Sequence, residues 1–246
     1  MTKIKKFLPL ILLLLGIVVI VGAYFFVTRS KKEGDITEDE TSLIEVPLSD
    51  RPITSLTPSN DGHWLTLVIE KITIDAASLD YELLYKLPDG RTQGVPGSIN
   101  LDGENEIERE LLLGSESSGK FRYDEGVEKG TLTLRFRNEK GKLIAKFSTE
   151  FALLSGISEL ASVDEDFTVS LNKKSSEYFV VMETFGVPEV PGGEVVSGPY
   201  GVFSSATTLS GTVKIGSGTL HRWSGSEWSS VSGETSGIGI FIGLSE

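Results

Sequence analysis

The chain has 246 residues, of which 39% are hydrophobic and 24% charged, a balance typical of proteins that bury a core. Its formal net charge of −12 argues against nucleic acid as a partner, because phosphates require clustered lysine and arginine. The absence of cysteine excludes disulfides, thiolate metal sites, cysteine nucleophiles and lipid attachment at cysteine.

The first predicted element is Phe7–Val27, an uncharged run that reads FLPLILLLLGIVVIVGAYFFV. At 1.5 Å per residue, a helix of this length matches the roughly 30 Å hydrocarbon core of a bilayer. The sequence therefore predicts a single transmembrane helix that acts as a signal anchor, with the lipid bilayer as its partner. Residues 1–6 are predicted to form a short cytoplasmic tail.

Two properties of this anchor stay open. Cleavage of a signal peptide after Ala23 is the alternative, but Tyr24–Val27 continue the apolar run past that position and favour a retained anchor. Orientation is less constrained, because three basic residues lie on each side of the run. A short N-terminal tail followed by a large domain favours an extracytoplasmic C-terminal part and a single-pass location in the cell membrane.

Residues 28–58 are predicted to be an acidic and polar spacer. Pro47, Pro52 and Pro58 predict that this region lacks regular structure. Within it, Leu43–Leu48 is either a short first strand or the end of the spacer.

A first β-sandwich-like domain is predicted for residues 59–156. Apolar residues alternate with polar ones from Trp64, with a kink expected at Glu70–Lys71, and again over 79–87 and 107–113. A hairpin is predicted for residues 132–151. Short alternating strands of this kind indicate an all-β, antiparallel sandwich that is immunoglobulin-like in size.

A second, Gly/Ser-rich β-domain is predicted for residues 157–246. The junction at 153–166 is predicted to hold a helical turn. Tyr178–Phe185 is predicted to be a strand buried on both faces, because it is almost continuously apolar. Further strands are expected at 195–203, 209–215, 219–223 and 238–244. One continuous two-sheet domain is the alternative to two domains.

The candidate ligand-binding residues are Trp223, Trp228 and Tyr200. A two-residue turn at Gly225-Ser226 would place the two tryptophans opposite each other on a hairpin. Such a pair either closes a small core or, with Tyr200 nearby, forms an exposed platform for a sugar or a peptide.

Catalytic and metal sites find little support. An acidic stretch raises the question of calcium, but its spacing is not that of an EF-hand and favours a solvated acidic surface. The stretch comprises Asn100, Asp102, Glu104, Glu106, Glu108 and Glu110. His63 and His221 lie in no metal or catalytic-triad motif. No enzyme activity, metal or cofactor is therefore predicted.

Together these features predict a single-pass, membrane-anchored extracytoplasmic β-protein with a binding or structural role at the cell envelope. A protein or glycan at the cell surface is the expected partner. One alternative is a carbohydrate-binding module that uses an exposed Trp pair. The other is a surface glycan hydrolase that uses Asp and Glu side chains.

Overall fold

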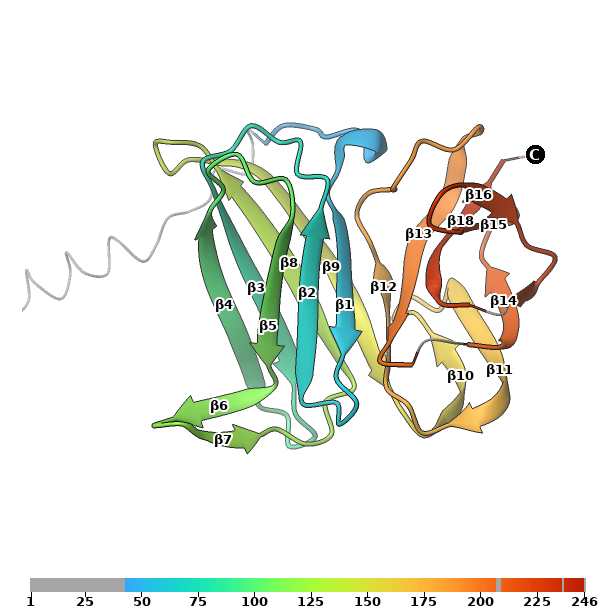
Figure 1. The fold of residues 1–246 in the computed structure, drawn as a ribbon, viewed down its shortest axis with the longest axis horizontal. Coiled ribbons are helices and arrows are strands. Elements are labelled where there is room, and N and C mark those ends of the chain that lie inside the picture. The colour runs from blue at the N-terminus through green and yellow to red at the C-terminus, as the bar shows by residue number, and fades with distance from the viewer. Residues whose placement is uncertain (1–42, 207–208, 236, 246) are drawn as a thin grey trace, which may run out of the picture. The chain divides into compact units, whose positions relative to one another are not determined.

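In the computed structural model, residues 43–206, 209–235 and 237–245 are described, and in this part the chain is all-β and antiparallel, as predicted (Figure 1). The first group of strands is β1 (Ile53–Pro58), β2 (Trp64–Glu70), β3 (Ser78–Lys86), β4 (Thr92–Asn100), β5 (Ile107–Leu112), β6 (Gly114–Ser117), β7 (Lys120–Tyr123), β8 (Lys129–Arg137) and β9 (Leu143–Leu154). The second group is β10 (Ile157–Ala161), β11 (Phe167–Ser175), β12 (Phe179–Glu183), β13 (Val195–Ser204), β14 (Gly211–Ile215), β15 (Thr219–Trp223), β16 (Trp228–Ser230), β17 (Glu234–Thr235) and β18 (Gly239–Leu244). A short 3₁₀ helix, η2, spans Leu48–Asp50.

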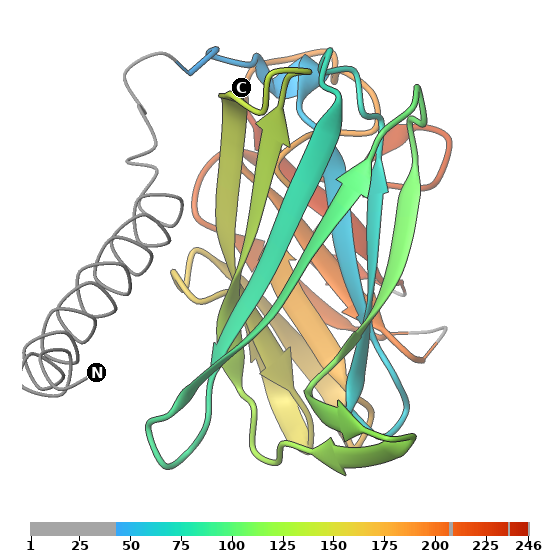
Figure 2. The same cartoon turned by 90° about the vertical axis from the view of Figure 1, so that its left-hand side faces the viewer.

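The largest sheet has nine strands, in the order β16-β15-β18-β13-β12-β9-β8-β3-β4. Two smaller sheets, β1-β2-β5 and β10-β11-β14-β17, cover parts of it, and β6 and β7 form a separate hairpin. Figure 2 shows the layers from the side.

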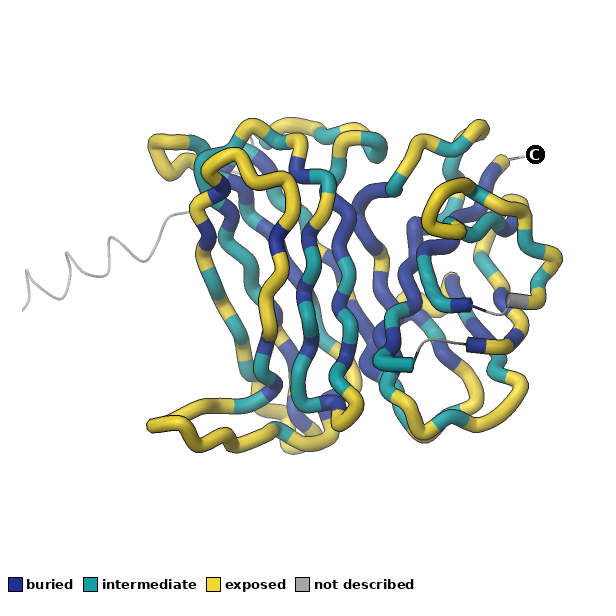
Figure 3. Tube along the Cα trace, viewed as in Figure 1, coloured by how far each residue is buried: buried dark blue, intermediate teal, exposed yellow. Residues whose placement is uncertain are grey.

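The two small sheets cover opposite faces of the large one, and β12 shows this directly. Val180 and Met182 belong to the core beneath β1-β2-β5, whereas Phe179 and Val181 belong to the core beneath β10-β11-β14-β17. Successive side chains of a strand point to opposite faces, so β12 is buried on both sides (Figure 3). This confirms the strand predicted within Tyr178–Phe185.

The predicted alternation is also confirmed in the first core. Leu65, Leu67 and Ile69 of β2 are fully buried, as are Leu79 and Leu83 of β3. The hairpin predicted for 132–151 forms from β8 and β9. The kink expected at Glu70–Lys71 coincides with the end of β2, where Lys71 has a φ of 57°.

Two expectations about regular structure were wrong. Ile53–Pro58, placed in the spacer, forms β1, because its prolines lie just before the strand and at its last residue, where they interrupt little of the ladder. The junction at 153–166 contains no helical turn but the end of β9 and all of β10. Ile157 and Leu160 are spaced as on a helix, but a register shift after Ile157 brings both to the same core.

Strand β4 was not expected, because Gly94, Pro96 and Gly97 interrupt its pattern. The strand tolerates this proline because it lies at the edge of the nine-stranded sheet, where a missing N–H donor leaves no neighbour unpaired.

Within the described residues, no helix is long and apolar enough to span a bilayer. The predicted tail 1–6, the anchor Phe7–Val27 and spacer residues 28–42 lie outside the described residues.

The large sheet extends through both predicted β-domains. Strand β12 of the second pairs with β9 of the first, over Phe179–Met182 and Phe151–Leu154. The division at residue 157 stays a prediction, and the unfolding behaviour of the chain tests it.

We expect the two cores to unfold together, because β12 supplies side chains to both. Met182→Ala should cost about 2–5 kcal/mol and lower the urea midpoint reported by Trp64 and that reported by Trp223 and Trp228 equally. Background variants lacking one set of tryptophans, Trp64→Phe or Trp223→Phe with Trp228→Phe, separate the two fluorescence signals.

Val190→Ala is the control, because this side chain is 62% exposed and its loss should change stability by less than about 0.5 kcal/mol. Two separate transitions, of which Met182→Ala moves only the one reported by Trp64, would show that the cores are independent.

Candidate functional site

The tryptophan pair has the predicted geometry. Trp223 and Trp228 are partners across β15 and β16, and their ring centroids lie 5.4 Å apart at an interplanar angle of 60°. The Trp228 Nε1–H donates to the Glu189 carbonyl oxygen at 2.8 Å. Both rings are only partly exposed, and Trp228 packs against the cluster of Val187 and its neighbours. Trp228 thus connects the loop between β12 and β13 to the sheet, through its hydrogen bond to Glu189 and its contact with Val187.

Tyr200 does not join this pair. Its side chain is 3% exposed and packs in the same core as Phe241, whereas Trp228 packs with Ile242, the next residue of β18. Because neighbouring residues of a strand face opposite sides, Tyr200 and the pair lie on opposite faces of the large sheet. The three residues therefore form no common surface.

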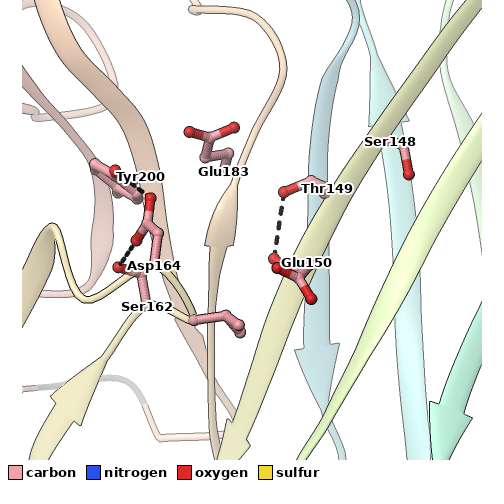
Figure 4. A pocket seen from close by; sticks show the side chains of 8 residues that line it. Ser148, Thr149, Glu150, Ser162, Asp164, Glu183 and Tyr200 are labelled. Carbon is pink, nitrogen blue, oxygen red and sulfur yellow. Dashed lines mark hydrogen bonds between the residues drawn. The ribbon is translucent and has the colours of Figure 1, made fainter.

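The Tyr200 hydroxyl instead points into a pocket of about 230 Å³, where it donates to Asp164 Oδ2 at 2.8 Å (Figure 4). The pocket is lined by Ser148, Thr149, Glu150, Ser162, Val163, Asp164, Glu183 and Tyr200. It lies between β9, the end of β12 and the turn from β10 to β11, so residues from both predicted domains contribute to it.

The carboxylates of this pocket differ in their environments. Burial raises the pKa of Glu183 above its ordinary value, and the charge of Asp164 adds to the effect. Burial also opposes ionisation of Asp164, but hydrogen bonds from the Ser162 and Tyr200 hydroxyls outweigh it and hold the pKa of Asp164 below its ordinary value. The Tyr200 phenol has a raised pKa because of burial and the bond to Asp164.

This divergence is the kind that separates an acid from a base in glycoside hydrolysis. However, both oxygens of Asp164 accept hydrogen bonds from the protein, from Ser162 and from Tyr200. The volume is also below the 300–1,000 Å³ of usual ligand sites. The pocket thus favours a structural role for Asp164, as the acceptor that fixes the turn to β13.

The acidic stretch around Gly103 forms part of an ordinary surface. Asp102 and Gly103 adopt positive φ in the turn between β4 and β5, and Glu110 accepts a hydrogen bond from Thr66 Oγ1 at 2.8 Å. Among the residues that the structure describes, no group of three or more histidine and carboxylate side chains is arranged to hold a metal ion.

A second group of aromatic side chains was missed at the sequence level. We define the hairpin aromatic surface as His63, Trp64, Phe121 and Tyr123, contributed by β2 with its preceding turn and by β7. The His63 and Tyr123 rings stack at 4.1 Å and 9°, and Phe121 is nearly parallel to Tyr123 at 6.2 Å and 8°. Trp64 meets Phe121 edge-on at 5.6 Å. Phe121 is 46% and Tyr123 38% exposed, so this surface faces solvent.

The hairpin formed by β6 and β7 has only a short pattern in the sequence. Ser118 and Gly119 both have positive φ, which is the type I′ geometry of a two-residue hairpin. Phe121 and Tyr123, two residues apart, then fall on one face of β7. Four-residue strands on either side of the turn gave too little alternation to predict this hairpin.

The hairpin is fixed at its base. The Leu113 N–H donates to the His63 carbonyl at 2.9 Å, and the Asp124 N–H donates to the Leu113 carbonyl at 2.9 Å. The Asp124 carboxylate accepts a bond from the Tyr85 hydroxyl at 3.0 Å, and Tyr85 is 2% exposed. The aromatic surface is therefore connected to the first core by hydrogen bonds.

Carboxylates flank the His63 ring. Nδ1 lies 3.2 Å from Asp61 Oδ2, and Nε2 lies 3.3 Å from Glu125 Oε1. Hydrogen bonds from the Ser59 hydroxyl and the His63 N–H lower the pKa of Asp61 to about 2, so this carboxylate is charged at neutral pH. The rim of the surface thus carries negative charge next to apolar rings.

The hairpin aromatic surface lies at the end of the first sandwich opposite to residue 43. Near the start of the described chain, the Ile44 N–H donates to Ile144 O at 3.0 Å, beside the turn between β8 and β9. Trp64 and its partner Leu112 lie at the other end of the ladder between β2 and β5. Figures 1 and 2 both show the start of the coloured chain at one end and β6-β7 at the other.

Comparisons of the chain with protein-family models, with curated proteins and with solved structures found no match.

Tyr200→Phe should reduce the free energy of unfolding by about 1–2 kcal/mol at pH 7, because a hydrogen bond to a charged group is lost. Since the pKa of Asp164 is lowered in the folded state, this stabilisation is complete above its ordinary value near 4 and declines as the pH falls through the folded-state pKa. Urea unfolding between pH 7 and pH 2 measures the difference.

The control is Tyr81→Phe, whose hydroxyl lies over Gly97 and whose removal should leave stability unchanged at every pH. A difference between wild type and Tyr200→Phe that stays constant down to pH 2 would contradict the assignment to Asp164.

Proposed function

We propose that this chain is a single-pass, membrane-anchored extracytoplasmic protein with a binding role at the cell envelope. The predicted anchor Phe7–Val27 supplies the attachment, and the β-structure from residue 43 onward supplies a stable body. The observation that carries the proposal is the placement of the exposed hairpin aromatic surface at the end opposite to residue 43. The end of the domain that carries this surface is thus distinct from the end at which the chain from the predicted anchor enters it.

The net charge supports a position in front of a membrane surface rather than flat against it. The whole chain has a formal net charge of −12, so an acidic domain of this kind is repelled by anionic lipid headgroups. Three basic residues lie on each side of the predicted anchor, next to its apolar run. A binding role is favoured because the surface presents two exposed aromatic side chains, Phe121 at 46% and Tyr123 at 38% exposure.

The absence of cysteine makes the orientation directly testable, since the natural chain gives no background with thiol reagents. We expect Lys120→Cys, at the start of β7, to react with a membrane-impermeant maleimide in intact cells. Thr2→Cys, in the predicted cytoplasmic tail, should react only after permeabilisation. The opposite pattern of labelling would overturn the proposed orientation.

Removal of residues 7–27 should transfer the protein from the carbonate-resistant membrane fraction to a soluble fraction. The matched control removes residues 28–41, which shortens the predicted spacer and should leave the protein in the membrane. A full-length chain that carbonate extracts from membranes would contradict the anchor itself.

A further inference from the structure

We propose that the hairpin aromatic surface binds a neutral polysaccharide, with sugar rings packed against Phe121 and Tyr123. The inference rests on the proposed function, because an envelope glycan meets the surface only if the domain lies outside the cytoplasm. It moves the carbohydrate site predicted from sequence away from Trp223, Trp228 and Tyr200.

The rings offer the kind of surface that a sugar face packs on. The C–H groups of a pyranose form an apolar face that lies on an aromatic ring, while its hydroxyls point outwards to water or to polar side chains. Phe121 and Tyr123 are nearly parallel with centroids 6.2 Å apart, a separation on the scale of one sugar unit. Both residues are accessible to a chain lying along β7, because Phe121 is 46% and Tyr123 38% exposed.

The surface is arranged before any ligand arrives. Tyr123 is held by its stack on His63 at 4.1 Å, and Phe121 is held by its edge contact with Trp64 at 5.6 Å. A binding surface whose side chains are already ordered loses little conformational entropy on binding. Exposed rings with no such support would have to be immobilised by the ligand.

The rim selects the charge of the ligand. Asp61 and Glu125 lie beside His63, and their carboxylates accept hydrogen bonds from hydroxyl donors. The same charges repel sulfated or carboxylated chains, which Lys120 and Arg122 on the other face of β7 do not offset at the rings. A neutral, hydroxyl-rich chain fits both the rings and the rim.

The size of the surface argues against a folded protein as the occupant. A stable protein partner covers about 800 Å² on each side. Here the exposed apolar area is confined to two rings of a four-residue strand, and the other two aromatic residues are only partly exposed. A narrow polysaccharide chain needs no more than this.

Affinity electrophoresis of the full-length chain tests the proposal, in a non-glycosidic detergent so that no sugar headgroup competes. The gels contain dextran, mannan, laminarin, xylan or galactomannan as neutral probes and heparin as the polyanionic probe. We expect at least one neutral polysaccharide to retard the wild-type chain and heparin to leave it unaffected. Phe121→Ala and Tyr123→Ala should each weaken that retardation about tenfold or more, as the loss of an aromatic anchor does.

Tyr123→Phe keeps the ring and should retain most of the binding, which separates loss of the ring from loss of the fold. Leu84→Ala is the matched control, because Leu84 on β3 is apolar and 37% exposed, close to the 38% of Tyr123. It should bind as the wild type does. The urea midpoint of each variant should differ from that of the wild type by no more than the midpoint of Leu84→Ala does, which shows that the variant is folded.

The proposal is overturned if no neutral polysaccharide retards the wild type, if heparin alone does, or if Phe121→Ala and Tyr123→Ala bind normally. Loss of binding in Trp223→Phe but not in Tyr123→Ala would return the site to the tryptophan pair. Any of these results together with surface labelling of Lys120→Cys would leave the proposed anchored function intact.

Discussion

Burial of β12 on both faces is the constraint on which the rest of the architecture depends. Val180 and Met182 face one core and Phe179 and Val181 the other, so these four residues have no solvated side, and the charged Glu183 lies at the exposed last position of the strand. One small sheet packs on one face of the large sheet, and the other small sheet packs on the opposite face further along it. Where the two packed regions overlap, a strand of the large sheet must be apolar on both faces. The two small sheets then expose different surfaces. The hairpin aromatic surface adjoins one of them and the Asp164 pocket the other.

The same constraint explains what could be predicted from sequence. A run as apolar as Tyr178–Phe185 leaves few structures other than a doubly buried strand, and the clean alternation over 79–87 leaves few other than a half-buried one. The hairpin of β8 and β9 follows from alternation on both sides of a turn. These patterns are local, because side chains two residues apart on a strand point to the same face of the sheet.

The rest depends on contacts that are distant in the chain. Tyr200 lies in a predicted strand and Trp228 on the predicted hairpin, but their faces follow from which strands pair with β18 and from two register shifts in β13. The bulge in β10 gives Ile157 and Leu160 a spacing that is also found on helices. Strand β4 contains Pro96, which is compatible with a strand because β4 lies at the edge of its sheet. Phe121 and Tyr123 became neighbours of His63 and Trp64 only through folding. The candidate site was therefore less predictable than the strands around it.

The hydrogen bond between Tyr85 and Asp124 joins a buried side chain of the first core to the residue that follows Tyr123. Through this bond the order of the hairpin depends on the folding of the first core. A molecule that binds only the ordered hairpin must raise the melting temperature of the core by mass action. Conversely, a substitution at a buried position of the first core can change how well the hairpin is ordered without altering any residue of the aromatic surface.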